Sequence, residues 1–250
     1  MDFKIKTFKA IKPKKAIMLT GFPGIGNVGK IAIDFLIDSI KPLKIMEITS
    51  NRFPHSVFVT EQGLLEMPSV KIFYKKVKDN EFILVSGDAQ PVNEGACYAF
   101  CEKLLSIAKD LKCPEVITMG GIGLGKIPKK PKVFVSGNNK NYIKSFPNCN
   151  IKIYGVVGPI IGVTGLLAGM AKEKNMLSAV LLAQTFAHPI YLGVKGAKEI
   201  LAVLNEKYGF KLELKKMADE IEAIEAEALL PGIEEAVAEK VKKPVMSYFG

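Results

Sequence analysis

The sequence has no tryptophan, only two histidines and only four cysteines among its 250 residues. Four cysteines are too few for a disulfide scaffold at this length, no Cys-x-x-Cys pair is present, and neither histidine lies near a cysteine. No apolar run approaches the roughly 20 residues that cross a bilayer, and the first fifteen residues lack an apolar segment of signal-peptide length. We therefore expect a cytoplasmic protein with no membrane partner, metal or disulfide framework.

Charge is unevenly distributed along the chain. The formal net charge is +10, but residues 217–250 carry eight acidic residues and three lysines, a net of −5, which leaves +15 on the rest. A basic body is typical of nucleic-acid binding. Here the lysines are scattered, apart from short clusters at residues 12–15 and 129–132, and no aromatic stacking motif accompanies them. We expect a solvated lysine-rich surface without a nucleic-acid partner, and an acidic tail that packs on the body or on a neighbouring subunit.

The stretch from Lys15 to Ser39 organises the chain. An apolar run at residues 16–20 predicts a buried strand, residues 21–29 form a glycine-rich turn, and residues 28–37 show helical apolar spacing. The turn contains Gly-x-Gly-x-x-Gly at residues 24–29, and a following strand at residues 43–48 presents Glu47 at its end. This layout matches a dinucleotide-binding fingerprint, but glycines also permit a close strand-to-helix turn without any ligand.

The remaining elements alternate between strands and helices. Strands are expected at 3–11, 56–60, 70–74, 82–86, 115–119, 133–135, 151–154 and 176–185, the last at the sheet centre, and helices at 94–111, 138–146, 166–172 and 196–208. Asn and Asp between residues 78 and 81 suit a hairpin turn. This order predicts an α/β fold with a mostly parallel central sheet, forming one domain over residues 1–213, followed by a helical extension over residues 214–250.

Two further glycine-rich turns follow strands, at residues 120–125 and 155–165. Glycine turns at the carboxyl ends of parallel strands let backbone N–H groups face an anion, and they also let helices pack tightly on a sheet. We leave both interpretations open. Asp88 and Glu94 follow another buried strand, although Asn93 or Asp88 could simply cap the next helix. A ligand pocket here would use Gly24, Gly26, Asn27, Gly29, Asp88, Gly121, Gly123 and Thr164.

The extension carries a narrow apolar stripe formed by Met217, Ile221 and Ile224. Such a stripe cannot make a core alone, so it should dock on another helix, either of this chain or of a second subunit. The chain then ends in Tyr248, Phe249 and Gly250. Aromatic residues at this place are either frayed or an anchor for a partner's pocket.

Three motifs in register resemble the signature turns of the proteasome assembly chaperone family, with the archaeal members most similar. They are the turn at residues 21–29, Gly-Gly-Ile-Gly at residues 120–123, and the glycine-rich stretch at residues 158–169. The resemblance covers about residues 10–215. It implies a three-layer α/β/α sandwich similar to nucleoside phosphorylases, no established catalysis, no cofactor, and a homo-oligomeric ring, either a tetramer or a pentamer. The partners that it implies are proteasome α-subunits or another protein of the chaperone family.

The same resemblance gives the tail a role. Some archaeal members end in a hydrophobic–tyrosine–any-residue motif that enters pockets between proteasome α-subunits, where its carboxylate pairs with a lysine. The matching positions are Tyr248, Phe249 and Gly250, with Phe249 where tyrosine is expected. This departure keeps the ring but loses the hydroxyl and any hydrogen bond that it made, typically about 1 kcal/mol.

Enzymatic alternatives remain at this stage. A dinucleotide-dependent oxidoreductase would use the fingerprint, although Pro23 and the later glycine turns do not belong to that pattern. A ligase-like enzyme would need paired carboxylates for Mg²⁺ beside a phosphate loop, and none are found. A phosphorylase-like enzyme would need Asp88 or Glu94 as nucleophile or acid. No catalytic residue is assigned, and the favoured interpretation is a non-enzymatic chaperone or scaffold.

Overall fold

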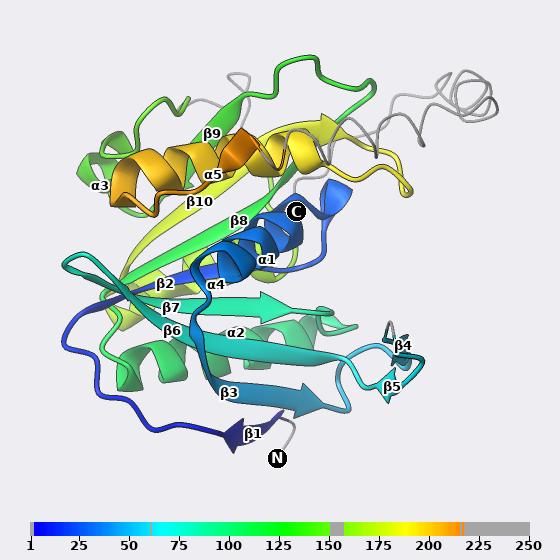
Figure 1. Ribbon diagram of the computed structural model, residues 1–250, viewed down its shortest axis with the longest axis vertical. Coiled ribbons are helices and arrows are strands. Elements are labelled where there is room, and N and C mark those ends of the chain that lie inside the picture. The colour runs from blue at the N-terminus through cyan, green and yellow to red at the C-terminus, as the bar shows by residue number, and fades with distance from the viewer. Residues whose placement is uncertain (1–2, 61, 151–157, 216, 218–250) are drawn as a thin grey trace.

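The centre of the computed structural model is an eight-stranded sheet with the order β1-β3-β6-β7-β2-β8-β10-β9 (Figure 1). The structure describes residues 3–60, 62–150, 158–215 and 217. The strands are β1 (Phe3–Thr7), β2 (Ala16–Gly21), β3 (Leu43–Ser50), β6 (Ser69–Val77), β7 (Asn80–Gly87), β8 (Glu115–Leu124), β9 (Val133–Gly137) and β10 (Leu177–Phe186). A separate two-stranded sheet pairs β4 (Phe58–Val59) with β5 (Leu65–Glu66).

The strands β7, β2, β8 and β10 pair in parallel, which confirms the parallel centre expected for an α/β fold. The pairs on either side, β1–β3, β3–β6, β6–β7 and β10–β9, are antiparallel, so the sheet is mixed. The expected hairpin at residues 78–81 joins β6 to β7. The strand β10 was expected at the sheet centre but lies next to the edge strand β9.

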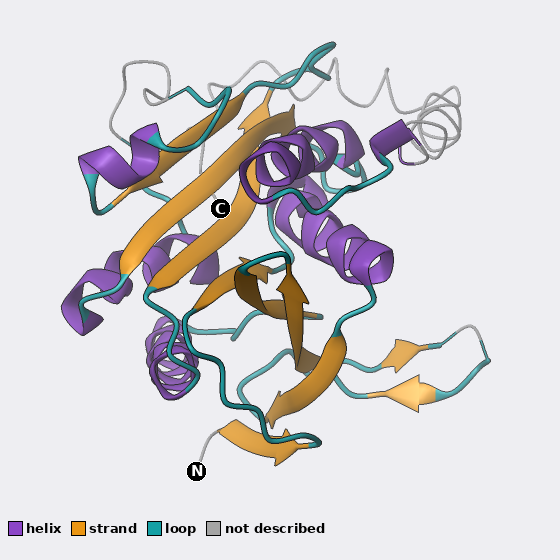
Figure 2. Ribbon diagram, turned by 60° about the vertical axis from the view of Figure 1, so that its left-hand side comes forward, coloured by secondary structure: helices purple, strands orange, loops and turns teal. Residues whose placement is uncertain are grey.

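Helices cover both faces of this sheet and make three layers (Figure 2). They are α1 (Val28–Ile40), α2 (Glu94–Asp110), α3 (Lys140–Lys144), α4 (Val163–Ala171) and α5 (Val194–Tyr208), with short 3-10 turns η1 (Ile25–Asn27) and η2 (Lys172–Lys174). One large buried cluster joins α1 and α5 to the sheet, and a second joins α2 and α4 to the opposite face. A small third cluster lies between α4 and the strands β8, β9 and β10.

The strand β2 shows why the sheet must be covered on both sides. Its residues are all buried, and they alternate between the two cores: Ile17 and Leu19 face α1 and α5, whereas Ala16 and Met18 face α2 and α4. A strand with apolar residues on both faces has no side for water, so it belongs inside a three-layer fold.

The structure corrects two sequence-based expectations. The residues 120–124 continue β8 instead of forming a glycine turn, because glycines are tolerated in a strand where another backbone approaches closely. Glu47 lies inside β3 with Lys44 at 2.6 Å, and β6 and β7 separate β3 from β2. The acidic residue of a dinucleotide fingerprint belongs on the strand beside the glycine turn, so Glu47 does not fulfil that role.

Candidate functional site

The glycine-rich turn leaves the carboxyl end of β2 and starts α1. Gly26 and Asn27 both have left-handed backbone conformations, with φ of 61° and 52°. The Gly26 carbonyl accepts a hydrogen bond from the Gly193 amide at 2.7 Å, which ties the turn to the segment before α5. A Cβ at Gly26 would lie 2.6 Å from Thr185 Oγ1. Position 26 therefore requires glycine for both its φ and its packing.

Gly29 of the fingerprint and Gly121 of β8 serve helix–sheet packing. Gly29 is fully enclosed, and a Cβ there would collide with the Met119 carbonyl of β8. Gly121 of β8 in turn lies directly under the Ile25 carbonyl. These contacts bring the backbone of the turn and of α1 directly against the backbone of β8. Packing, the simpler of the two interpretations of this motif, accounts for both residues.

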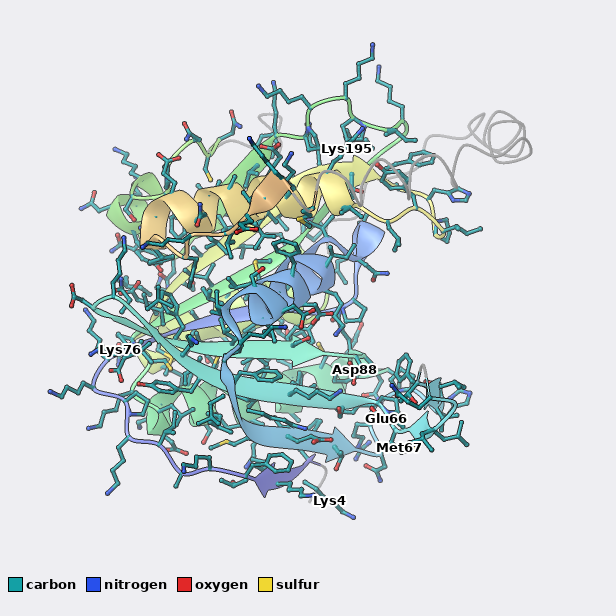
Figure 3. The ribbon with its side chains drawn as sticks, viewed as in Figure 1. Lys4, Glu66, Met67, Lys76, Asp88 and Lys195 are labelled. Carbon is teal, nitrogen blue, oxygen red and sulfur yellow. The ribbon has the colours of Figure 1, made fainter. Side chains whose placement is uncertain are left out.

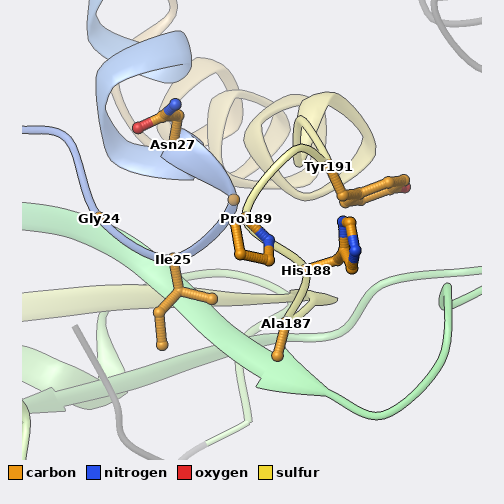
Figure 4. A pocket seen from close by; sticks show the side chains of 8 residues that line it. Gly24, Ile25, Asn27, Ala187, His188, Pro189 and Tyr191 are labelled. Atoms are coloured by element: carbon orange, nitrogen blue, oxygen red, sulfur yellow. The ribbon is translucent and has the colours of Figure 1, made fainter. Parts of the chain in front are cut away.

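A small pocket of about 340 Å³ opens above this turn (Figure 4). It is lined by Gly24, Ile25, Gly26, Asn27, Ala187, His188, Pro189 and Tyr191. The His188 ring stacks on Phe186 with centroids 5.6 Å apart, and its Nδ1 accepts a hydrogen bond from the Ile190 amide at 3.4 Å. Three of the eight residues expected in a ligand pocket line it. The other five, Gly29, Asp88, Gly121, Gly123 and Thr164, are not among the lining residues.

Asp88 belongs to a separate charged cluster at the end of β7. Its Oδ1 lies 3.4 Å from Lys30 Nζ, and its Oδ2 accepts hydrogen bonds from the Ser69 amide and hydroxyl at 3.3 and 3.1 Å. Lys30 also pairs with Asp34 at 2.8 Å. The cluster joins α1, β6 and β7. Both oxygens of Asp88 have partners within the fold, so its visible role is to hold these elements together.

Thr164 and the start of α4 are likewise occupied by the protein itself. The Thr118 hydroxyl donates to the Thr164 carbonyl at 2.8 Å, and Thr164 is buried. Gln90 Oε1 accepts from the Val163 amide at 2.8 Å, while its Nε2 donates to the Pro23 carbonyl. Gln90 therefore takes the place that an anion would need at this helix end, and it links the glycine turn to α4.

A larger groove of about 810 Å³ runs between α2 and α4. Its start is the loop that ends in Asn93, whose side chain accepts a hydrogen bond from the Ala96 amide at 2.9 Å. This confirms Asn93 as the cap of α2, and Glu94 lies exposed on the wall of the groove. Exposed apolar side chains also line it: Val92 (61% exposed), Tyr98 (54%) and Ile161 (49%). An apolar groove open to water is typical of a binding surface.

The groove also contains Cys97, and the four cysteines differ in their chemistry. A hydrogen bond with Cys101, one helical turn further along α2, lowers the pKa of the half-buried Cys97 against the opposing effect of burial. That hydrogen bond and burial both raise the pKa of Cys101. Burial raises the pKa of Cys113 to about 12 and of Cys149 to about 11. Cys97 is therefore the thiol most readily ionised.

Residues of the expected tail stripe lie mostly outside the described chain. Met217 is described and is 1% exposed, within the cluster that joins α1 and α5 to the sheet. It packs on its own chain, which is one of the two dockings expected for the stripe, and it is not available to a neighbouring subunit. Ile221, Ile224, Tyr248, Phe249 and Gly250 lie outside the described residues.

Sequence reasoning missed three features at this edge of the sheet. Lys30 had a visible signal, because Asp34 follows it at the helical i,i+4 spacing. Gln90 had none, since its partners are 67 and 73 residues away. The strand expected at residues 56–60 contains β4, but its pairing with β5 was missed, although a second short apolar run follows Gly63.

Within the described ranges, no three His, Cys, Asp or Glu side chains are grouped so as to hold a metal ion. The helices described there also include none long and apolar enough to span a bilayer.

Comparisons with known proteins place the chain in a family. The model of the PAC2 family matches residues 18–229. The chain belongs to the PAC2 family. An uncharacterized protein of Methanocaldococcus jannaschii is 30% identical over 237 residues, which cover 94% of this chain and 86% of the relative. The resemblance noted in the three glycine-rich motifs is thereby confirmed.

Two solved structures from Pyrococcus furiosus share the PAC2 fold with this chain. One is PbaB, described as an archaeal proteasome activator, with a TM-score of 0.84, 26% identity, and coverage of 93% of this chain and 99% of PbaB. The other is PbaA, described as an archaeal homolog of proteasome-assembly chaperone, with a TM-score of 0.76, 23% identity, and 96% coverage of both chains. The expected three-layer α/β/α architecture is therefore the architecture of PAC2 proteins.

Proposed function

We propose that this PAC2 protein is a non-enzymatic, homo-oligomeric scaffold that acts on the proteasome as an assembly chaperone or adaptor. The observation that carries the proposal is the likeness to PbaB over nearly the whole of both chains. Two features of the site are consistent with it. Gly26 and Gly29 of the fingerprint are used for packing, and Asp88 is used to join α1 to the sheet. The groove between α2 and α4 instead presents apolar side chains to a partner.

The proposed contact with the proteasome is the tail. Tyr248 and Phe249 would enter pockets between α-subunits, as the tail motif of the family implies. Deleting residues 245–250 should then abolish binding and leave the body folded, because the described residues up to Met217 already form two extensive buried cores. The domain of residues 1–213 and the extension of residues 214–250 remain part of this proposal.

Native mass spectrometry with purified archaeal proteasome α-subunits tests the contact. The full chain should bind, and the chain lacking residues 245–250 should not. A matched variant, Phe249→Tyr, restores the tyrosine of the motif and should tighten binding by about 1 kcal/mol, roughly fivefold. Binding that survives the deletion would show that another surface makes the contact, and an unfolded deletion variant would show that the tail is structural.

A further inference from the structure

The hairpin of β4 and β5 projects from the body of the molecule (Figure 2). Figure 3 labels Glu66 and Met67 in this segment, which lies beyond the edge of the sheet that carries Asp88. We call residues 57–60 and 62–67 the apolar hairpin. Neither strand joins the main sheet. A two-stranded ribbon gains little stability from its own contacts, so a partner surface that covers it would add to its stability.

The strands of the apolar hairpin are joined by hydrogen bonds within the hairpin itself. The Thr60 amide donates to the Leu64 carbonyl at 2.8 Å, and the Leu64 amide donates to Thr60 Oγ1 at 3.1 Å. Its base is fixed in the body by Phe53, which is 5% exposed, and by the buried Ser69. The exposure of its side chains is therefore a property of a preformed structure, which binds at a lower entropic cost than a loose loop.

One face of the apolar hairpin is wholly apolar. Val59 pairs with Leu65 and Phe58 with Glu66, so continuing this register places Val57 opposite Met67. Residues two apart share a face of a strand. Val57, Val59, Leu65 and Met67 thus lie on one face, and they are 51%, 68%, 69% and 63% exposed. Leu64, which is 66% exposed, lies on the other face with Glu66 and Phe58, and Phe58 is 44% exposed.

This face is too small to hold two proteins together alone. Four side chains with about two thirds exposed offer roughly 400 Å² of apolar surface, whereas a stable interface buries about 800 Å² per partner. The groove between α2 and α4 supplies a second apolar area on the same chain, through Val92, Tyr98 and Ile161. The Val92 amide donates to the Arg52 carbonyl at 3.1 Å, so the groove begins beside the base of the hairpin.

We propose that the apolar hairpin of one copy lies in the groove between α2 and α4 of a second copy. A projecting apolar ribbon and a concave apolar groove occur side by side on every copy, so each copy both gives and receives such a contact. In a reciprocal contact each copy contributes both areas, which together come closer to the size of a stable interface than the hairpin alone. The inference rests on the proposed homo-oligomeric scaffold and names the surface that builds it.

The assembly mass of the full chain tests the inference by light scattering and native mass spectrometry across a range of concentrations. Leu65→Asp should raise the dissociation constant of the assembly at least tenfold, because it puts a charge on the apolar face. Leu64→Asp is the matched control, with the same substitution one residue away on the opposite face, and should leave the mass unchanged. Tyr98→Asp in the groove should reproduce the effect of Leu65→Asp, and circular dichroism confirms that each variant is folded.

A cross-link identifies the site of contact. In the variant Leu65→Cys, treated with a mild oxidant such as copper–phenanthroline, the new thiol should form a disulfide with the native Cys97 in the groove of the second copy. Peptide mapping after non-reducing electrophoresis should then find residues 65 and 97 joined between chains. Ile190→Cys, at an equally exposed position of the loop before α5, should not link to Cys97. The inference is overturned if the wild-type chain is monomeric, if Leu65→Asp keeps its assembly, or if Leu64→Asp dissociates equally.

These outcomes separate the inference from the proposed function. Loss of the assembly in Leu65→Asp with no binding of α-subunits by the wild-type chain supports the interface and refutes the proteasome contact. If binding to α-subunits requires residues 245–250 and Leu65→Asp leaves the assembly mass unchanged, the proteasome contact is supported and the proposed interface is refuted. A wild-type monomer whose binding to α-subunits is lost in Leu65→Asp would assign the apolar hairpin to the proteasome and overturn the second copy as its partner.

Discussion

The glycine-rich turn at residues 21–29 and the apolar hairpin leave the sheet at the same edge, after the co-directional strands β2 and β3. The turn is packed into the body at both ends: Gly29 meets the Met119 carbonyl, and Phe22 is 2% exposed. The hairpin holds its apolar side chains in water. The glycine-rich turn, which stands out in the sequence, therefore serves the fold. The apolar hairpin, which does not stand out, offers the proposed binding surface. Recognition in a scaffold requires exposed apolar area rather than a residue signature.

The packed end of the turn, at Gly29, should tolerate substitution least of all positions at this edge of the sheet. Gly29→Val places a branched side chain on the Met119 carbonyl, so we expect a loss of more than about 4 kcal/mol of stability or failure to fold. Gly169→Ala is the control. A Cβ there has open space, and alanine should stabilise α4 by about 0.5–1 kcal/mol. Urea denaturation measures both, and a Gly29→Val protein of normal stability would disprove the packing role.

The charged cluster behind the turn should have a smaller effect. Lys30→Met removes the ammonium between Asp34 and Asp88, which leaves two carboxylates without their shared partner. The Lys30 side chain is 24% exposed, so solvent weakens the interaction and we expect a loss of about 1–2 kcal/mol. Lys30→Arg keeps the charge and should recover much of the loss. Equal stability of the methionine and wild-type proteins in thermal unfolding would contradict this assignment.

Local patterns predicted most of the elements but not their arrangement. The buried run of β2, the helical spacing of α1 and the cap at Asn93 depend on neighbours in sequence, and each lies where expected. The position of β3 depends on β6 and β7 inserting between it and β2, a pairing that no local pattern specifies. The glycines of β8 resemble a turn in the sequence, because glycine is common both in turns and in strands that another backbone approaches closely.

The site was predicted less well for the same reason. Gly24, Gly26 and Asn27 share a pocket because they are adjacent in sequence, whereas Asp88 and Thr164 were grouped with them only on the assumption that strand ends converge. Hydrogen bonds over long sequence separations decide the matter: Asp88 is held by Ser69, and Gln90 occupies the start of α4. Such pairings require the tertiary structure.

The groove beside the hairpin can be probed by its thiol. The pKa of Cys97 is lowered and that of Cys149 is raised to about 11, so iodoacetamide at pH 7.5 should alkylate Cys97 at least about tenfold faster. The comparison is made in the Leu65→Asp chain, where no second hairpin covers the groove. Cys101→Ala should slow the reaction at Cys97 by removing its hydrogen bond. Peptide mass spectrometry follows each site, and equal rates at Cys97 and Cys149 would refute the assignment.

The smallest effect on stability is expected from Glu81, which lies at the start of β7, at the opposite end of this strand from Asp88. Burial acts to raise the pKa of Glu81, but hydrogen bonds from the Tyr74 hydroxyl at 2.8 Å and from the Lys14 and Lys15 amides hold it below its usual value. A carboxyl whose pKa is lowered by folding stabilises the protein above its unfolded pKa, and this contribution is lost as the pH falls through the folded pKa.

Glu81→Gln should therefore cost less than about 1 kcal/mol at pH 7, because this carboxylate is in contact with solvent. The difference from wild type should shrink between about pH 5 and pH 3, as the wild-type carboxyl takes up its proton. Denaturation at a series of pH values measures it, with the exposed Glu102→Gln in α2 as the control. A difference that grows on acidification would mean that these hydrogen bonds favour the protonated acid, which would reverse the sign of the argument.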